Sequence, residues 1–385
     1  MKQSIKVVVA PDSFKGSISA RDAAAAIEKG LYMAEEGSVD LTVITSPIAD
    51  GGEGTLAALA DEKDCHTLTV TGPDGNPVEA AFGIKNETAV IEMAAAAGLT
   101  LIPEEKRSAA TATTYGVGEL ICAALDLGYR HILLTVGGSA TNDGGCGMIA
   151  ALGARFLDEN GNAFVPTGGS LDRIAAIRTD GLDPRLSDTL FTVATDVCNP
   201  LFGEDGATYI YGRQKGADEA SLAHMEKGMR HYAELLCTLA ERDVASLAGC
   251  GAGGGLPAPL LAFCKAEITS GIRAVLETVG FDRHLADADL VITGEGRLDA
   301  QSLYGKAISG VTEAAGARGI PVVCLVGCVA GDRTALLRMG IEAIFATADI
   351  APDAAYSMAH ADELLTTLSE RVFADFLTRK LAQKH

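Results

Sequence analysis

The sequence predicts an α/β protein of two domains, with an outer domain whose mostly parallel sheet is formed by both ends of the chain. Three observations support this fold class. The chain has 385 residues, more than one hydrophobic core usually holds. At both ends, short β-branched apolar runs alternate with stretches of helical spacing, which is typical of parallel sheets. The middle opens with period-two alternation, which indicates an antiparallel hairpin.

Both ends of the chain predict alternating strands and helices. Residues 5–10 (IKVVVA) form the continuous apolar run of a strand buried on both faces. Apolar residues then recur at helical spacing from Ala20 to Leu31, and 40–45 (DLTVIT) is the next strand. Further strands are expected at 289–293, 321–327 and 342–346, and a last helix at 361–381. We infer an outer domain of residues 1–65 and 286–385.

The middle, residues 66–285, predicts an inserted α/β domain. Its hairpin spans 66–84 around the turn GPDGNP. The α/β alternation then returns, with strands expected at 88–93, 131–136 and 190–195, and helices at 117–127, after Asp143 and at 220–242. The two domains are expected to pack closely, because no low-complexity linker separates them.

Composition excludes several classes of partner. With 31 basic and 51 acidic residues the net charge is −20, which disfavours nucleic acid and anionic membranes. Nine cysteines form no C-x-x-C pair, so we expect free thiols in a reducing compartment. The opening MKQSIKVVVAPD predicts a strand rather than a signal peptide. We therefore expect a cytoplasmic protein. The sequence leaves open whether it forms a homodimer.

Four loops share one composition and one position. They span 10–17, 46–55, 133–148 and 292–306, and each begins where a predicted strand ends, the place where open α/β sheets bind ligands. Each combines glycine or proline with acids, and the first and last add lysine or arginine. Acids suit Mg²⁺, and cations suit phosphate oxygens. One such loop is explained by turns and helix caps, whereas four favour a shared site for an anionic ligand.

Familiar signatures are mostly missing. The phosphate-loop pattern G-x-x-x-x-G-K-[ST] is absent, and GCGAGG at 249–254 follows a predicted helix, which weakens a dinucleotide interpretation. No G-x-S-x-G elbow or histidine cluster occurs. Asp196 and Asn199 lie just past a predicted strand. There a carboxylate could accept a proton, hold a metal or begin a turn.

The loops, in this order, resemble the first type of bacterial glycerate kinase. The matching stretches include APDSFKGSISA, IADGGEGT, GGSATNDGG, DVCNPL, QKGA and VITGEGRLDAQSLYGKA, and they cover nearly the whole chain. The resemblance implies ATP-dependent phosphorylation of D-glycerate with Mg²⁺, usually to 2-phosphoglycerate, and an inserted flavodoxin-like region with the β-hairpin. Arg213, Pro257 and Pro259 depart from the family pattern, and we expect these departures to act on loop stiffness or nucleotide preference.

Candidate roles follow from the loops and the resemblance together. The predicted catalytic residues are Asp196 as general base, Lys15, and Asp50 as the alternative base. The residues predicted to bind the nucleotide and its phosphates are Gly137, Gly138, Ser139, Lys215, Gly294, Gly296 and Lys306. The lysines, Lys15 included, could instead bind the glycerate carboxylate. Ser13, Arg297 and Asn199 are predicted to bind substrate. Metal ligands are expected among Asp50, Glu53, Asp143, Glu295 and Asp299, which are too many for one ion.

Other functions stay open at this point. The product could be 3-phosphoglycerate, or the acceptor another small hydroxy acid. A sensor without catalysis is a different class, and the many acids and lysines at strand ends argue against it. A dehydrogenase is the weakest alternative, because no strand-linked dinucleotide fingerprint occurs.

Overall fold

The computed structural model describes residues 2–35, 37, 39–52, 54–299, 306–338 and 340–382. The chain divides into two compact units. Unit 1 comprises Met1–Asp50 and Val275–His385, and unit 2 comprises Gly51–Ala274. That these units are the domains predicted from the sequence, with boundaries near 66 and 286, stays a prediction.

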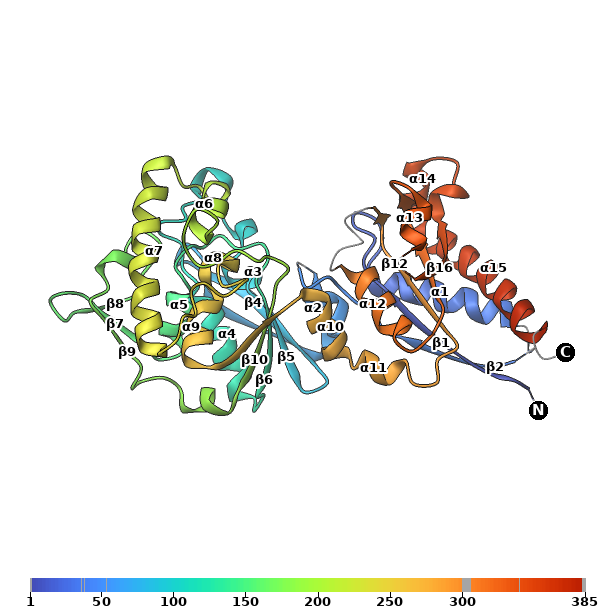
Figure 1. Cartoon of the computed structure of the whole chain (residues 1–385), viewed down its shortest axis with the longest axis horizontal. Coiled ribbons are helices and arrows are strands. Elements are labelled where there is room, and N and C mark those ends of the chain that lie inside the picture. Colours follow the sequence, from blue (N-terminus) through green and yellow to red (C-terminus); the bar gives the residue numbers. More distant parts are fainter. Residues whose placement is uncertain are drawn as a thin grey trace. The chain divides into compact units, whose positions relative to one another are not determined.

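Unit 1 contains a parallel sheet of five strands (Figure 1). Its main elements are β1 (Ser4–Pro11), α1 (Ala20–Glu35), β2 (Asp40–Thr45), α11 (Phe281–His284), β12 (Leu290–Gly294), α12 (Ala307–Gly316), β14 (Val322–Val326), α13 (Arg333–Leu337), β16 (Ile341–Ala346), α14 (Ala354–Ala359) and α15 (Ala361–Ala382). The strand order is β2-β1-β12-β14-β16, and every pair is parallel. A two-stranded ribbon pairs β13 (Arg297–Leu298) with β15 (Cys328–Val329). The parallel sheet predicted from both ends of the chain is confirmed.

Numbered along the chain, the five strands of unit 1 have the order 2-1-3-4-5, which is the flavodoxin order. The order reverses where the chain leaves β2 and returns as β12 on the other side of β1. The resemblance led us to expect the flavodoxin-like arrangement in the inserted region instead. Pairing between segments distant in the chain decides strand order, so local patterns do not reveal it.

Unit 2 contains a mixed sheet of six strands. Its main elements are α2 (Thr55–Leu59), β3 (Cys65–Thr71), β4 (Pro77–Lys85), β5 (Thr88–Glu92), α3 (Ala94–Ala97), α4 (Tyr115–Asp126), β6 (His131–Thr135), α5 (Cys146–Ala151), β10 (Leu190–Ala194), α6 (Ala207–Tyr211), α7 (Glu219–Ala240), α8 (Ala252–Gly255), α9 (Pro257–Phe263) and β11 (Lys265–Thr269). Helix α10 (Gly271–Val279) crosses the division between the units. The sheet order is β11-β10-β6-β5-β4-β3, with sequential parallel strands followed by the predicted hairpin of β3 and β4.

A second, smaller sheet in unit 2 was not predicted from the sequence. It joins β7 (Arg155–Leu157), β8 (Ala163–Phe164) and β9 (Ala176–Arg178) by antiparallel pairing. Strands of two or three residues are too short to carry a periodic signal.

Pro257, one of the departures from the family pattern, lies in the first turn of α9. A missing backbone N–H costs no hydrogen bond at this position of a helix.

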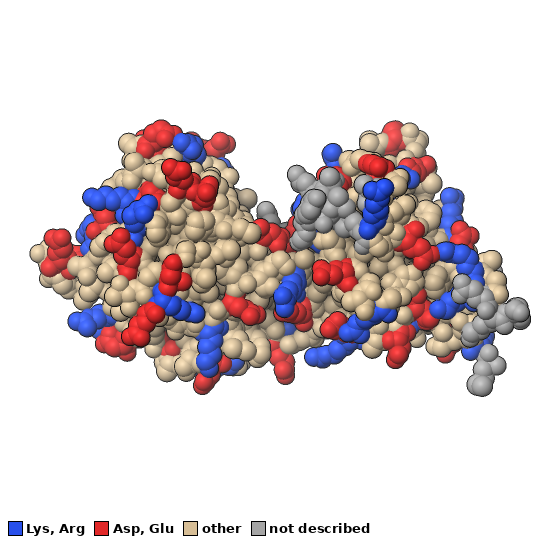
Figure 2. Space-filling model, in the orientation of Figure 1, with Lys and Arg blue, Asp and Glu red and all other residues tan. Residues whose placement is uncertain are grey.

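The acidic and basic side chains of the described residues form no single patch of one sign on the visible face (Figure 2). Figure 2 shows acidic and basic side chains interspersed on this face of the molecule. Among the described helices, none combines the length and apolar character that a membrane span requires.

Helices α1 and α15, from opposite ends of the chain, pack together at a glycine (Figure 1). A Cβ atom added at Gly30 would lie 2.1 Å from Ser369 Oγ and 2.2 Å from the Thr366 carbonyl oxygen. We expect Gly30→Ala to lower the free energy of unfolding by about 1–3 kcal/mol, measured by chemical denaturation, because the helices must separate. Gly316→Ala is the control, since its Cβ would meet nothing within 4 Å. Equal stability of the two variants would contradict this packing.

Candidate active site

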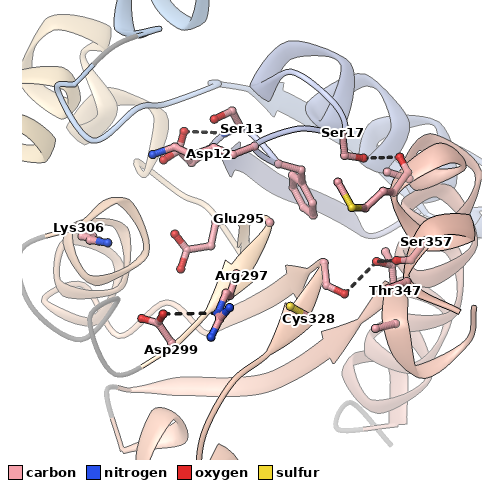
Figure 3. A pocket seen from close by; sticks show the side chains of 18 of the residues that line it. Asp12, Ser13, Ser17, Glu295, Arg297, Asp299, Lys306, Cys328, Thr347 and Ser357 are labelled. Carbon is pink, nitrogen blue, oxygen red and sulfur yellow. Dashed lines mark hydrogen bonds and ion pairs between the residues drawn. The ribbon is translucent and has the colours of Figure 1, made fainter. Parts of the chain in front are cut away.

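The carboxyl ends of the unit 1 strands border a cavity of about 370 Å³ (Figure 3). Segments that follow β1, β12, β14 and β16 all line it, together with α14 and the start of α15. Its lining includes Asp12, Ser13, Phe14, Lys15, Ser17, Asp50, Glu295, Gly296, Arg297, Asp299, Lys306, Cys328, Thr347, Ser357 and Met358. The structure therefore brings residues of two of the four predicted loops into one pocket, together with Asp50 from a third.

Charged side chains gather at one side of this cavity. Figure 3 shows Asp12, Glu295, Arg297, Asp299 and Lys306 on one side, whereas Ser17, Thr347 and Ser357 lie at the other side, and Cys328 lies beside its strand partner Arg297. The Lys15 ammonium lies 3.8 Å from an Asp50 carboxylate oxygen, and Arg297 Nε lies 3.7 Å from Asp299 Oδ2. The side chains of Lys15 and Arg297 are 78% and 68% exposed, so both can turn toward a ligand.

Asp12 is a site residue that sequence reasoning did not single out. It directly follows β1, is 7% exposed, and accepts a hydrogen bond of 2.6 Å from the Ser13 backbone N–H. Burial, with a smaller contribution from the Asp50 carboxylate, raises the pKa of Asp12 to about 6, although the Ser13 hydrogen bond and Lys15 oppose the shift. Its place directly after a buried strand was the available signal. Its burial depends on residues far along the chain.

The raised pKa makes Asp12 a source of instability at neutral pH. The native protein holds the Asp12 proton more tightly than the unfolded chain, whose ordinary value is 3.8, so stability falls as pH rises from 3.8 to 6. We expect Asp12→Asn to raise the free energy of unfolding by on the order of 1–3 kcal/mol at pH 8, and by less at pH 4.5. Denaturant unfolding of both proteins at the two pH values measures this. A variant equally or less stable at pH 8 would contradict the burial argument.

The two glycines predicted in the fourth loop have different surroundings. Gly296 lines the unit 1 cavity, and its Cβ would lie 3.2 Å from Phe14 Cα. Gly294 ends β12 inside the sheet, where a Cβ would lie 1.8 Å from the Leu325 carbonyl oxygen. Its own carbonyl accepts the Asp12 N–H at 2.8 Å. Gly294 therefore permits close strand packing and is not part of the cavity lining.

Unit 2 has a smaller pocket, of about 180 Å³, around a buried lysine. Gly137, Gly138 and Ser139 line it after β6, and Lys215 belongs to a short 3-10 helix after α6. The Lys215 ammonium donates to Ser139 Oγ at 2.8 Å and to the Thr141 carbonyl at 2.7 Å. Burial lowers the pKa of Lys215 to about 7, against the opposing charge of Asp143. Four of the predicted phosphate ligands are thus assembled within unit 2.

Asp143 and Asn199 are engaged in holding loops together. Asp143 is fully buried and accepts hydrogen bonds from the Thr114 N–H and hydroxyl, both at 2.8 Å, and from the N–H groups of Gly145 and Gly147. Burial raises its pKa although these bonds oppose the shift. Asn199 donates to the Asp205 carbonyl and accepts from the Tyr211 hydroxyl, both at 2.7 Å. These contacts favour structural roles for both residues over the predicted metal and substrate contacts.

Asp196 is exposed just past β10 and lies outside the lining of the unit 2 pocket. Its neighbours Thr195 and Val197 line that pocket, while Asp196 Oδ1 accepts the Gly271 N–H at 2.9 Å. The predicted metal ligand Glu53 lies outside the described residues. Among the residues that are described, no group of three or more His, Cys, Asp or Glu side chains is arranged to hold a metal ion.

The fold and its pockets define an α/β protein with pockets at the carboxyl ends of parallel strands, the place where open α/β sheets bind ligands. The model of the glycerate kinase family matches residues 7–377. The chain is 46% identical to a glycerate 2-kinase of Escherichia coli (strain K12) over 345 residues, covering 89% of this chain and 90% of the relative. It is 43% identical to a glycerate kinase of Bacillus subtilis (strain 168), covering 98% and 99% of the two chains.

The structure comparison agrees with these relatives. The crystal structure of a candidate glycerate kinase 2 from Salmonella typhimurium LT2 superposes with a TM-score of 0.87 and 39% sequence identity, and the match covers 100% of both chains. This protein belongs to the glycerate kinase family.

Proposed function

We propose that this protein is an ATP-dependent kinase of D-glycerate that phosphorylates the 2-hydroxyl group and yields 2-phosphoglycerate and ADP. Family membership and the names of its relatives in Escherichia coli and Bacillus subtilis support the reaction class. The structural observation that carries the proposal is the unit 1 cavity, where lysine, arginine and carboxylate groups meet at the carboxyl ends of parallel strands. Phosphoryl transfer depends mainly on such positioning and charge.

The chemical step of this reaction requires one group that accepts the hydroxyl proton of glycerate. The glycerate hydroxyl oxygen forms a bond to the γ-phosphorus, the bond from that phosphorus to the bridging oxygen of ADP breaks, and the hydroxyl proton passes to a carboxylate. Asp196 is the proposed general base, with Asp50 as the alternative. Asp12 is a third carboxylate, and its pKa of about 6 suits a base working near neutral pH.

The remaining charged residues would bind the anions. Lys15, Arg297 and Lys306 line the unit 1 cavity and are proposed to contact phosphate or carboxylate oxygens, with the Ser13 hydroxyl beside them. Arg297 can offer two parallel donors to one anion. Lys15→Ala is therefore expected to lose most turnover without unfolding, because its side chain is largely exposed.

The donors in this cavity fit Mg²⁺. Asp12, Asp50, Glu295 and Asp299 supply carboxylate oxygens, the ligand type that this hard cation prefers. Protein sites commonly hold Mg²⁺ through one or two carboxylates together with substrate phosphates, so a cage of three protein ligands is not required. One or two of the carboxylates of Asp50, Glu295 and Asp299 would hold the ion, with Glu53 and Asp143 as the other predicted ligands. When bound, Mg²⁺ would neutralise negative charge on the phosphates.

The test couples the purified protein to enolase without a mutase, with D-glycerate, ATP and Mg²⁺. Immediate formation of phosphoenolpyruvate is expected, because only 2-phosphoglycerate is an enolase substrate. ADP release without phosphoenolpyruvate would instead identify the 3-phospho product. Faster ADP release with L-glycerate or tartronate would identify another acceptor. A cytoplasmic location and a homodimer stay predictions.

A further inference from the structure

We propose that the two pockets divide the substrates: the unit 1 cavity binds ATP, with the adenosine in its apolar half, and the unit 2 pocket binds the glycerate carboxylate through Lys215. This inference rests on the proposed function and deepens it, since it names the substrate that each pocket takes. It also changes two sequence predictions. Gly137, Gly138 and Ser139 were assigned to the nucleotide, with Lys215 assigned to phosphate or the glycerate carboxylate. Ser13 and Arg297, which line the unit 1 cavity, were assigned to the substrate.

The strand order of unit 1 is the first argument. In an open parallel sheet, ligands bind outside the carboxyl ends of the strands where the strand order reverses. In the order 2-1-3-4-5 this point lies between β1 and β12. Asp12 follows β1 directly and Glu295 follows β12 directly, and both line the cavity. The same strand order binds a mononucleotide at the same switch point in flavodoxin.

The size and the apolar half of the cavity are the second argument. Pockets that enclose ligands of drug size hold about 300–1,000 Å³. The unit 1 cavity, at about 370 Å³, lies in this range, and the unit 2 pocket, at about 180 Å³, lies below it. Phe14, Ala348, Ala354, Met358 and Ala361 also line the unit 1 cavity. Ala354 and Met358 belong to α14, as does Ser357, which Figure 3 shows on the side away from Glu295 and Lys306. Met358 is 51% exposed, which leaves apolar surface for a flat base to cover.

The mixture of charges in the other half is the third argument. Lys15, Arg297 and Lys306 can neutralise phosphate oxygens. The cavity also carries the carboxylates of Asp12, Asp50, Glu295 and Asp299, which would repel the carboxylate of free glycerate. A polyphosphate that brings its own Mg²⁺ uses both kinds of group at once. This half of the cavity therefore suits the nucleotide better than it suits glycerate.

The unit 2 pocket has the opposite character. Lys215 is the one charged residue among its described lining, and Ser139, Tyr211 and Gln214 add polar groups. An ammonium has three donors, and the described residues account for two of them, Ser139 Oγ and the Thr141 carbonyl. The third is available to a ligand. A small pocket whose one charged lining residue is a buried cation matches a three-carbon monoanion.

Two neighbouring alanines allow a matched test. Ala354 and Ala355 both begin α14 and are both exposed, but only Ala354 lines the cavity. We expect Ala354→Trp to fill the apolar half and raise the Kd of ATP at least tenfold, measured by calorimetry on the full chain. Its affinity for inorganic tripolyphosphate should stay within twofold of wild type, because that probe needs only the charged half. Ala355→Trp should change neither value.

The second arm uses the unit 2 pocket. Lys215→Met should leave the Kd of ATP within twofold of wild type and raise the Kd of D-glycerate at least tenfold. Met358→Ala should raise the Kd of ATP, by less than Ala354→Trp does, and leave the Kd of D-glycerate unchanged. Wild-type affinity for ATP in Ala354→Trp, or a tenfold loss of ATP affinity in Lys215→Met, would overturn the division. These are binding measurements, so they are independent of turnover. Failure of the proposed function would appear instead as wild-type protein that binds ATP but releases no ADP with D-glycerate.

Discussion

Replacing Lys215 with methionine is expected to lower kcat/KM for D-glycerate by on the order of a thousandfold, with the chain still folded. Removing one partner from a buried charge pair costs about 2–5 kcal/mol, and about 4 kcal/mol corresponds to that factor. Lys215 is 2% exposed, so water can hardly replace it. Steady-state kinetics at fixed ATP concentration measure the loss, and circular dichroism checks the fold.

The pH dependence makes this expectation specific. Burial lowers the pKa of Lys215 to about 7, so the ammonium is charged below pH 7 and loses its proton above it. A bound carboxylate requires the charged form, so KM for D-glycerate should rise from pH 7 upward, by up to about tenfold per pH unit. In Lys215→Met this rise should disappear. Lys227→Met, an exposed change on α7, is the control. A KM that is flat from pH 6 to 9 in wild type would contradict the role of Lys215.

Replacing Asp196 with asparagine is expected to lower kcat by about 10²–10⁴-fold, the usual contribution of a general base. The variant should fold normally, because the asparagine oxygen can still accept the Gly271 N–H that Asp196 Oδ1 accepts at 2.9 Å. Single-turnover kinetics with saturating ATP separate this chemical step from product release. The Kd of ATP should stay unchanged.

Control variants decide between the carboxylates. Glu234→Gln on α7 removes the same charge from an exposed position of unit 2 and should leave kcat unchanged. Asp12→Asn and Asp50→Asn test the other two candidates under the same conditions. If Asp196→Asn kept kcat within twofold of wild type while Asp12→Asn lost a hundredfold, the base would be Asp12 and the sequence prediction would be wrong.

Most of the regular structure could be predicted because it is encoded locally. The strand at 40–45 and the helix beginning at Ala361 were predicted at the bounds where the structure has β2 and the start of α15. The β3–β4 hairpin followed from the alternation on both sides of GPDGNP. The small sheet of β7, β8 and β9 was missed because its strands are too short to form a pattern.

The candidate site was only partly predictable, because burial and hydrogen-bond partners come from distant parts of the chain. Lys215 donates to Ser139, 76 positions earlier, and Asp143 accepts from Thr114, 29 positions earlier. Neither contact can be seen from the loop in which each residue lies. The same limit explains why Asp12 was overlooked and why the close strand packing at Gly294 was not foreseen.

The sequence by itself determined the α/β class, the loops rich in glycine and charge, and the family, because each depends on residues close together in the chain. Tertiary structure alone decided which loops share a pocket and which acids are used internally, as Asp143 is by four hydrogen bonds. It also decided the pKa values of Asp12 and Lys215. The physical reason is that the desolvation that shifts a pKa depends on all the residues packed around the group. The strand order of the sheet brings these residues together from distant parts of the chain.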